Sequence, residues 1–414
     1  MMENSNIVNR FLTYVKIDTQ SNEEILKSPS SEGQRELLHY LQKELISLGI
    51  KNIDMDEQGG ILYAKIPSNT QKEGIKAIGF ITHVDTAPDA SGKNIKPKII
   101  ENYNGQDIEL NKNITLKVNE FPEILEYKNK SLIVTDGTTL LGADDKAGIA
   151  EVMSMIEFIM QNPEVLHGEI CIAFTSDEEI SRGTKNFDIE RFGADVAYTV
   201  DGEKLGEISY ENFNAVRAEV TIKGKSVHTG YAKNKMMNAS DIACEFHSQI
   251  PIKEKAQTTE GYEGFYHLVS LKANVEKAEL IYNLRDFEKD SMDDRKKKLK
   301  EISENINGRY GKNTVNIVFK EQYENMKEYL KDNMELITNA QKAGERVGVK
   351  SFIQPVRGGT DGARLTVRGL PCPNLGAGGR NFHGVYEFVC IEDMKKIAEI
   401  LIELVKIQLI SCVH

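Results

Sequence analysis

The chain has 414 residues and a mass of 46.5 kDa, more than one hydrophobic core usually supports, so we expect two domains. Its 52 basic and 63 acidic residues give a net charge of −11 without an extended basic face, which argues against nucleic acid and anionic lipid as partners. The five cysteines are scattered, the first residues lack an export signal, and no apolar run approaches about 18 residues. These features predict a cytoplasmic protein with reduced thiols that enters no membrane.

Segments typical of strands and helices alternate along the first half of the chain. Apolar residues at helical spacing predict one helix from Arg35 to Gly49 and another over 147–160. Short apolar runs predict strands over 61–66, 77–82, 169–175 and 194–200. The alternation indicates an α/β fold with a mixed, mainly parallel sheet and helices on both faces.

A different pattern begins after Asn212. It predicts, in chain order, a strand, a helix, two strands, a helix and a strand, over 213–223, 238–250, 265–273, 278–285, 289–306 and 314–321. This β-α-β-β-α-β order is that of a ferredoxin-like α+β domain. Because helices predicted over 329–347 and 392–409 restore the first pattern, we expect a lid domain inserted into a catalytic domain. The expected boundaries are 1–211 and 326–414 for the catalytic domain and 212–325 for the lid.

Two adjacent glutamates, Glu178 and Glu179, follow the predicted strand 169–175 in the sequence TSDEEI. Like charges this close resist joint ionisation unless a cation or a proton separates their roles. One carboxylate can therefore bind a metal ion while its neighbour transfers protons, as in metal-assisted hydrolysis. Taken alone, the pair is more simply explained as two solvated side chains on a loop.

Other carboxylates and imidazoles also stand at the ends of predicted strands or in loops. His83 and Asp85 end one strand two residues apart, on the same side of an extended chain, so Asp85 can hold the second ring nitrogen of His83. Asp144 lies in the turn LGADDKAG, Asp201 follows a strand in YTVDG, and His383 lies in the Gly-rich loop GGRNFHG. All of them could converge on the carboxyl edge of one sheet.

Each of these residues has an ordinary explanation when taken alone. Asp144 is explained as a helix cap, Asp201 as a turn residue, and a single histidine as a surface or hydrogen-bonded side chain. That last explanation is the one we adopt for His39, His167, His247, His267 and His414. Together, two histidines and several carboxylates suit zinc, cobalt or manganese better than magnesium or calcium.

Motifs for other chemistries are incomplete. The GKS at Gly224 lacks the upstream glycine of a phosphate-binding loop, and the GAGG at Gly376 lacks the strand and the acidic partner of a dinucleotide site. The sequence contains no Gly-x-Ser-x-Gly, and no cysteine has neighbours that would lower its pKa. Catalysis by a serine or cysteine nucleophile is therefore not expected.

At these residues the chain resembles the peptidase T family, the tripeptide aminopeptidases among the co-catalytic di-zinc metallopeptidases that also include aminoacylases and carboxypeptidase G. The resemblance covers nearly the whole chain. It rests on HVDTAPDASGKN, GTTLLGADDKAGIAE, DEE, FGADVAYTVDG, TTEGYEGFYHL, RDF, RGGTDGA and GLPCPN. It implies two zinc ions, with cobalt or manganese possible, bridged by Asp144. His83 and Asp201 would hold one ion, and Glu179 and His383 the other.

The same resemblance implies roles for neighbouring groups. Glu178 would be the general base and Asp85 would orient His83. The peptide bond after the bridging aspartate is often cis in this family, which here means a cis bond between Asp144 and Asp145. None of these residues is missing, so the chain gives no sign of a non-catalytic protein built on a hydrolase fold.

The inserted domain would act as a lid over the substrate, in a monomer or in a homodimer formed through the lid. His228, in GKSVHTG, resembles the family's lid histidine, which is placed to donate a hydrogen bond to the oxyanion. Arg285 in NLRDF and Arg357 in VRGGTDG could hold the terminal carboxylate of a peptide and so measure its length. An ordinary loop histidine and two surface arginines are the alternatives.

The chain departs from the family pattern at a few positions. Thr229 replaces the proline that usually follows the lid histidine, and Ser181 stands where glycine is usual. Arg380, Val385 and Tyr386 are changes near the last ligand, and Arg380 either binds substrate or forms a salt bridge elsewhere. We expect a metallo-aminopeptidase that releases the N-terminal residue from short peptides, above all tripeptides. The alternatives are a related carboxypeptidase, dipeptidase or N-acyl amino acid deacylase.

Overall fold

The structure is a computed structural model that describes residues 4–410, so Cys412 and His414 lie outside the described residues. Contacts divide the chain into two compact units, and the second consists of Glu211–Glu328 and Pro355–Gly359. The five residues 355–359 were expected in the catalytic part. They belong to the second unit because Val356 pairs with Asn212 and its N–H donates to the carbonyl of Glu211.

The first unit is built on a mixed sheet of eight strands in the order β1-β2-β8-β3-β9-β16-β10-β15. The four central strands β8, β3, β9 and β16 run parallel to one another. Every residue of β3 and β8 is buried, as expected for continuous apolar runs inside a parallel sheet. The bounds are β1 Asn52–Asp56, β2 Ile61–Ile66, β3 Ile78–His83, β8 Ile170–Thr175, β9 Val196–Gly202, β10 Glu207–Ser209, β15 Phe352–Ile353 and β16 Asn374–Gly376.

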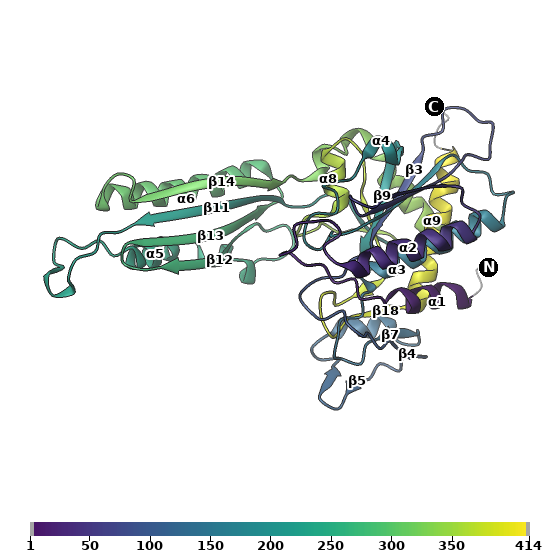
Figure 1. Ribbon diagram of the computed structural model, residues 1–414, viewed down its shortest axis with the longest axis horizontal. Coiled ribbons are helices and arrows are strands. Elements are labelled where there is room, and N and C mark those ends of the chain that lie inside the picture. Colours follow the sequence, from purple (N-terminus) through teal and green to yellow (C-terminus); the bar gives the residue numbers. More distant parts are fainter. Residues whose placement is uncertain (1–3, 411–414) are drawn as a thin grey trace. The chain divides into compact units, whose positions relative to one another are not determined.

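Helices lie on both faces of this sheet, which confirms the predicted fold class (Figure 1). α3 (Ala143–Gln161) packs on β3 and β9 and also contacts α1 (Asn4–Tyr14) and α9 (Ile391–Ile410). A second cluster joins strand side chains such as Ile81 and Ala173 to Phe192 of α4 and Leu365 of α8. The remaining bounds are α2 Glu32–Ser47, α4 Ile189–Phe192, α7 Glu335–Arg346 and α8 Asp361–Val367.

Two small sheets complete the first unit, and the sequence analysis predicted neither. One has the order β17-β18-β7-β4 and the other pairs β5 with β6. Their bounds are β4 Lys98–Ile100, β5 Ile108–Asn111, β6 Ile114–Leu116, β7 Leu132–Val134, β17 Gly379–Arg380 and β18 Phe388–Cys390. The pairing of β18 with β7 brings the segment after His383 beside the segment that leads to Asp144.

The second unit is a four-stranded antiparallel sheet in the order β12-β13-β11-β14, with α5 and α6 lying along it (Figure 1). Ile242 and Phe246 of α5 and Leu299 and Ile302 of α6 share a core with the sheet. The predicted β-α-β-β-α-β order is confirmed. The bounds are β11 Asn214–Lys223, α5 Ala239–Ser248, β12 Phe265–Ala273, β13 Lys277–Asp286, α6 Lys289–Tyr310 and β14 Val315–Tyr323.

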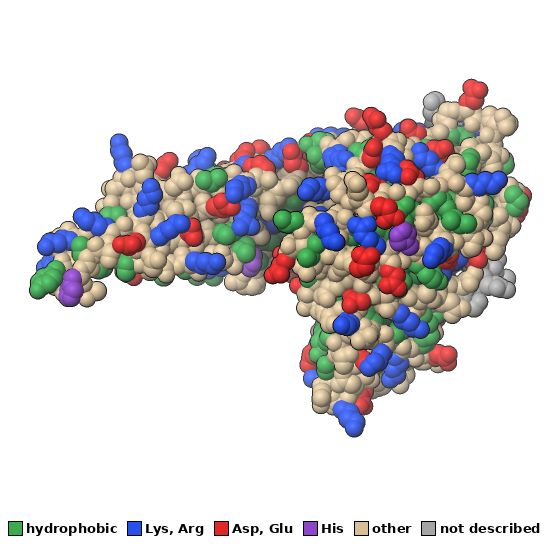
Figure 2. All heavy atoms as spheres, viewed as in Figure 1, with side chains coloured by type: hydrophobic (Ala, Val, Ile, Leu, Met, Phe, Trp, Pro, Cys, Tyr) green, Lys and Arg blue, Asp and Glu red, His purple; other side chains and the backbone are tan. Residues whose placement is uncertain are grey.

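Three expectations from the sequence concern membrane helices, surface charge and thiols. None of the helices within 4–410 is long and apolar enough to cross a membrane. On the face shown in Figure 2, basic and acidic side chains are interspersed and not gathered by sign. The four cysteines within the described residues are free thiols, at positions Cys171, Cys244, Cys372 and Cys390.

Candidate active site

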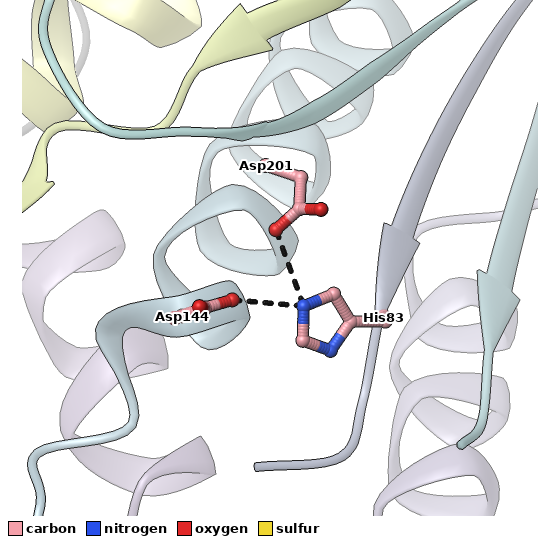
Figure 3. A group of neighbouring side chains, drawn as sticks. All are labelled: His83, Asp144 and Asp201. Carbon is pink, nitrogen blue, oxygen red and sulfur yellow. Dashed lines mark hydrogen bonds and ion pairs between the residues drawn. The ribbon is translucent and has the colours of Figure 1, made fainter. Parts of the chain in front are cut away.

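Three of the predicted residues meet at the carboxyl edge of the large sheet (Figure 3). Nε2 of His83 lies 2.8 Å from Oδ1 of Asp144 and 3.2 Å from Oδ1 of Asp201. His83 ends β3 and Asp201 lies in β9, its parallel neighbour, while Asp144 stands in the first turn of α3. Neighbouring parallel strands end at the same edge of a sheet, which is why these side chains converge.

A second group shares Asp144 with the first. Nε2 of His383 lies 3.4 Å from Oδ2 of Asp144 and 3.0 Å from Oε2 of Glu179. The two oxygens of Asp144 therefore face two different histidines, as required of a carboxylate that bridges two cations. Within each group the potential ligand atoms lie within 4.8 Å of one another.

The charges and the donor atoms of both groups suit two metal ions. Burial raises the pKa of Asp201 to about 7, and burial followed by the charge of Asp144 raises the pKa of Glu179 to about 8. Oε1 of Glu179 is buried without a hydrogen-bond partner among the described residues. Two imidazoles and three carboxylates match the ligand preference of first-row transition metals, and divalent cations would relieve the repulsion among the carboxylates.

The neighbouring carboxylates favour the protonated form of both histidines. Burial opposes a charge on His83, but Asp201 and Asp144 raise its pKa well above the usual value. Contacts with Asp144 and Glu179 raise the pKa of His383 to about 11. Without cations, protons on the histidines therefore balance the carboxylates, and a metal ion would have to displace these protons.

Asp85 connects His83 to the two glutamates. Its buried carboxylate accepts the backbone N–H of Glu178 at 3.0 Å and that of Glu179 at 3.1 Å. Its Oδ1 also lies 3.4 Å from Nδ1 of His83. Burial and then the charges of Asp361 and Asp201 raise the pKa of Glu178 well above the usual value, which suits a group that must accept a proton.

The peptide bond between Asp144 and Asp145 is cis, so this expectation is confirmed. Asp145 itself was not predicted to contribute to the site. Its Oδ2 accepts the backbone N–H of His83 at 3.1 Å, while its Oδ1 is buried without a partner among the described residues. Asp145 thus joins the loop of the bridging carboxylate to the end of β3.

Two further carboxylates beside the site were not predicted from the sequence. Oδ2 of Asp89 lies 3.4 Å from Nδ1 of His383, a place equivalent to that of Asp85 beside His83. Glu387 is buried and accepts three backbone N–H groups of the loop before α3. The signal for Glu387 was weak, since it consisted of one acidic residue in the otherwise aromatic and apolar segment VYEFVC.

The three predicted lid residues lie in the second unit and differ in their contacts. Nδ1 of His228 accepts the N–H of Gly230 at 3.2 Å, so the ring proton is on Nε2, which is left as a donor on an exposed side chain. Thr229, the residue in place of proline, begins a 3₁₀ turn, Thr229–Tyr231.

The two predicted arginines differ in how many hydrogen bonds they donate to other groups of the protein. Arg357 donates to the carbonyls of Gly261 at 2.6 Å and Glu263 at 2.9 Å, and also to the carbonyl and the hydroxyl of Thr259. Arg285 donates to the carbonyl of Leu284 at 2.9 Å and lies over a tyrosine ring. The contacts of Arg357 indicate that it shapes the segment 259–263.

The departures from the family pattern also have definite surroundings. Nη1 of Arg380 lies 2.7 Å from Oε2 of Glu203, so the salt bridge is the alternative that the structure favours for this residue. Ser181 has a φ of 62°, a left-handed conformation that glycine adopts without strain. None of the other described histidines belongs to either metal-ligand group. They have contacts of their own or lie on the surface, at positions His39, His167, His247 and His267.

Comparisons with known proteins agree with this geometry. The family model of the peptidase dimerisation domain matches residues 210–313. Peptidase T of Bacillus licheniformis is 48% identical to this chain over 403 residues, which are 97% of this chain and 98% of that protein. Such identity over nearly the full length of both chains is evidence of common family membership.

Solved structures share the fold. The crystal structure of the aminopeptidase PepT from Bacillus cereus matches with a TM-score of 0.77 at 23% identity and covers 99% of both chains. A tripeptidase from Staphylococcus aureus matches with a TM-score of 0.77 at 22% identity, again over 99% of both chains. Both matches extend over the two units described above.

Proposed function

Since the chain belongs to the peptidase T family, we propose that it is a metal-dependent aminopeptidase that releases the N-terminal residue from short peptides, above all tripeptides. One observation carries the proposal. One oxygen of Asp144 faces His83 and the other faces His383, and the backbone of Glu178 and Glu179 is held by Asp85. This is the arrangement that peptide hydrolysis by two metal ions needs.

In this proposal His83, Asp144 and Asp201 hold one ion, and Asp144, Glu179 and His383 hold the other. The ions are two zinc ions, although the same ligands suit cobalt and manganese. When bound, they supply Lewis acidity toward the peptide carbonyl and lower the pKa of water.

Residues of the chain itself transfer the proton and orient the histidine rings. Glu178 accepts a proton at its carboxylate and donates it to the leaving amine. Asp85 orients the ring of His83 and fixes the backbone under both glutamates, because it accepts the N–H of Glu178 and of Glu179. Asp89 orients the ring of His383 in the same manner.

The second unit supplies the substrate contacts. His228 donates a hydrogen bond from Nε2 to the oxyanion, since its Nδ1 is already an acceptor. Arg285 binds the terminal carboxylate of the peptide, and Arg357 contributes to the same region by holding the segment 259–263. Direct binding of the carboxylate by Arg357 stays a prediction.

The substrates, partners, oligomeric state and location of the enzyme are also part of what we propose. Short peptides are its substrates, and nucleic acids and membranes are not among its partners. The match of residues 210–313 to a peptidase dimerisation domain favours a homodimer over a monomer. The free thiols within the described residues are in keeping with a cytoplasmic location.

The decisive experiment compares three substrates with and without a chelator. Ala-Ala-Ala should be hydrolysed, Ala-Ala should be a poor substrate, and N-acetylated Ala-Ala-Ala should be resistant. The chelator should abolish hydrolysis, and added zinc should restore it. Equal rates for the free and the acetylated peptide would contradict an aminopeptidase and favour a carboxypeptidase or a deacylase of the same metallopeptidase group.

The role of Glu178 is tested by Glu178→Gln. Removal of a general base should lower kcat by at least about 10²-fold, and two metal ions should remain bound. Glu164→Gln, an equal change on the surface, serves as control and should keep full activity. Retained activity in Glu178→Gln would assign the proton transfer to another group.

A further inference from the structure

Glu387 joins two ligand-bearing loops that are far apart in sequence. Its buried side chain follows His383 by four residues and reaches the loop before α3. Oε2 accepts the N–H of Leu141 at 2.6 Å and of Gly142 at 2.8 Å, and Oε1 accepts the N–H of Asp144 at 3.1 Å. Glu387 and Asp144 are 243 residues apart.

These hydrogen bonds fix a loop that a helix alone would not define. Gly142 has a φ of 77°, and Asp144 and Asp145 depart from helical dihedrals, so this turn is not a regular part of α3. The N–H groups at a helix start have no partner within the helix, and a carboxylate is a strong acceptor for them. Glu387 therefore sets where the backbone of Asp144 lies relative to its own loop.

The two metal-ligand groups depend on Glu387 to different extents. His83 and Asp201 stand on β3 and β9, which pair with each other, so the sheet itself sets the spacing of two of the three ligands of the first group. Only Asp144 of that group stands on a segment that Glu387 joins. Asp144 and His383 of the second group stand on the two segments that Glu387 joins.

We propose that Glu387 is a positioning residue that sets the separation of Asp144 and His383 and thereby the affinity of the second group for its metal ion. The first group depends on Glu387 only through Asp144, because its other two ligands stand on paired strands, and it keeps most of its affinity without Glu387. The inference rests on the proposed binding of two metal ions, and it assigns to this chain a residue that controls one of the two sites selectively.

The test measures how tightly Glu387→Gln binds zinc. The metal-free, full-length variant and the original protein are each titrated with zinc in a calorimeter. Glutamine keeps the shape but turns one acceptor into an NH₂ group that faces backbone N–H donors. Loss of a supporting partner of a metal ligand costs about 10- to 100-fold in affinity. We expect that loss at one site only, while the other site stays within about threefold of the original protein.

A matched control is Glu392→Gln. Glu392 also accepts a backbone N–H, that of Ser131 at 2.9 Å, but it holds no ligand-bearing loop. The control should bind both ions as the original protein does. Titration with cobalt gives a second readout, because the visible spectrum of the cobalt at the second site should change in Glu387→Gln and not in Glu392→Gln.

Each outcome decides a separate point. If the original protein binds no metal, the proposed function fails, irrespective of Glu387. If the original protein binds two ions and Glu387→Gln binds both with unchanged affinity, or loses both equally, the inference about Glu387 is wrong. Should Glu387→Gln not fold, Glu387→Asp replaces it, and selective weakening of one site is again expected, whereas equal affinities at both sites would overturn the inference.

Discussion

Replacement of Asp85 by asparagine tests how the catalytic loop is held. The carboxylate of Asp85 accepts two backbone N–H groups, those of Glu178 and Glu179, one on each oxygen. An asparagine has one acceptor oxygen, so whichever way its amide lies, one N–H loses its partner and meets an NH₂ group instead.

The magnitude follows from that single lost bond. A hydrogen bond to a charged group contributes about 1.5–3 kcal/mol. Since about 1.4 kcal/mol corresponds to a factor of ten, the loss is about 10- to 150-fold. Because the disturbed backbone carries Glu178 and a metal ligand, the loss should be seen in kcat for Ala-Ala-Ala, with little change in KM.

The control makes the same change in a turn away from the site. Oδ1 of Asp56 accepts the N–H of Gln58 at 3.2 Å and that of Gly59 at 2.8 Å. Because one oxygen accepts both N–H groups, the amide oxygen of Asp56→Asn can keep both bonds, and kcat should stay unchanged. A kcat within about threefold of the original value in Asp85→Asn would refute the claim that Asp85 fixes the loop.

Three further predictions concern charge, lid and backbone. In the metal-free protein Asp201 and Glu179 have pKa values of about 7 and about 8, above those of an unfolded chain, so their contribution to stability is present at low pH and is lost as the pH rises from about 4 to about 8. The Tm of the metal-free protein should accordingly fall between pH 5 and pH 8, and zinc should raise it more at pH 8; a larger effect of zinc at pH 5 would contradict the assignment. Arg285→Lys should raise KM for tripeptides at unchanged Tm, whereas Arg357→Lys should lower Tm because its hydrogen bonds to backbone carbonyls are lost; an unchanged Tm in Arg357→Lys would show that these bonds contribute nothing. Ser181→Gly should change the free energy of unfolding by less than about 1 kcal/mol, since relief of left-handed strain offsets the greater freedom of unfolded glycine, while Ser181→Val should destabilise by more than about 1 kcal/mol in denaturant titrations.

The elements that the sequence predicted best are those whose buried side chains form a recognisable run or alternation of apolar residues. The strand expected over 169–175 is β8, Ile170–Thr175, and the strand expected over 265–273 is β12 with the same bounds. The small strands β17 and β18 were missed because two or three residues carry no periodicity and their pairing depends on distant segments. The helix expected from residue 329 begins only at Glu335, since a 3₁₀ turn, Lys331–Asn333, precedes it.

Residues of the site were predicted when their chemistry was visible in the sequence. His83, Asp144 and Asp201 are ligand types at the ends of apolar segments, and they lie together. Glu387 was missed because its hydrogen-bond partners are backbone N–H donors, which nearly any residue supplies and which no motif reveals. The contacts of Arg357 were missed for the same reason, as most of them go to backbone carbonyls of another loop.

The scaffolds of the two metal-ligand groups imply an order of metal binding. In the first group the side chain of His83 is 3% exposed and stands on a strand whose neighbour carries Asp201. In the second group the side chain of His383 is 43% exposed and stands in a loop, with a left-handed φ of 63°. A site on rigid, adjacent strands needs less ordering when it binds an ion than a site that depends on joined loops. The first group should therefore bind its ion more tightly, and the loops held by Asp85 and Glu387 should determine whether the second ion, and with it catalysis, is present at low metal concentration.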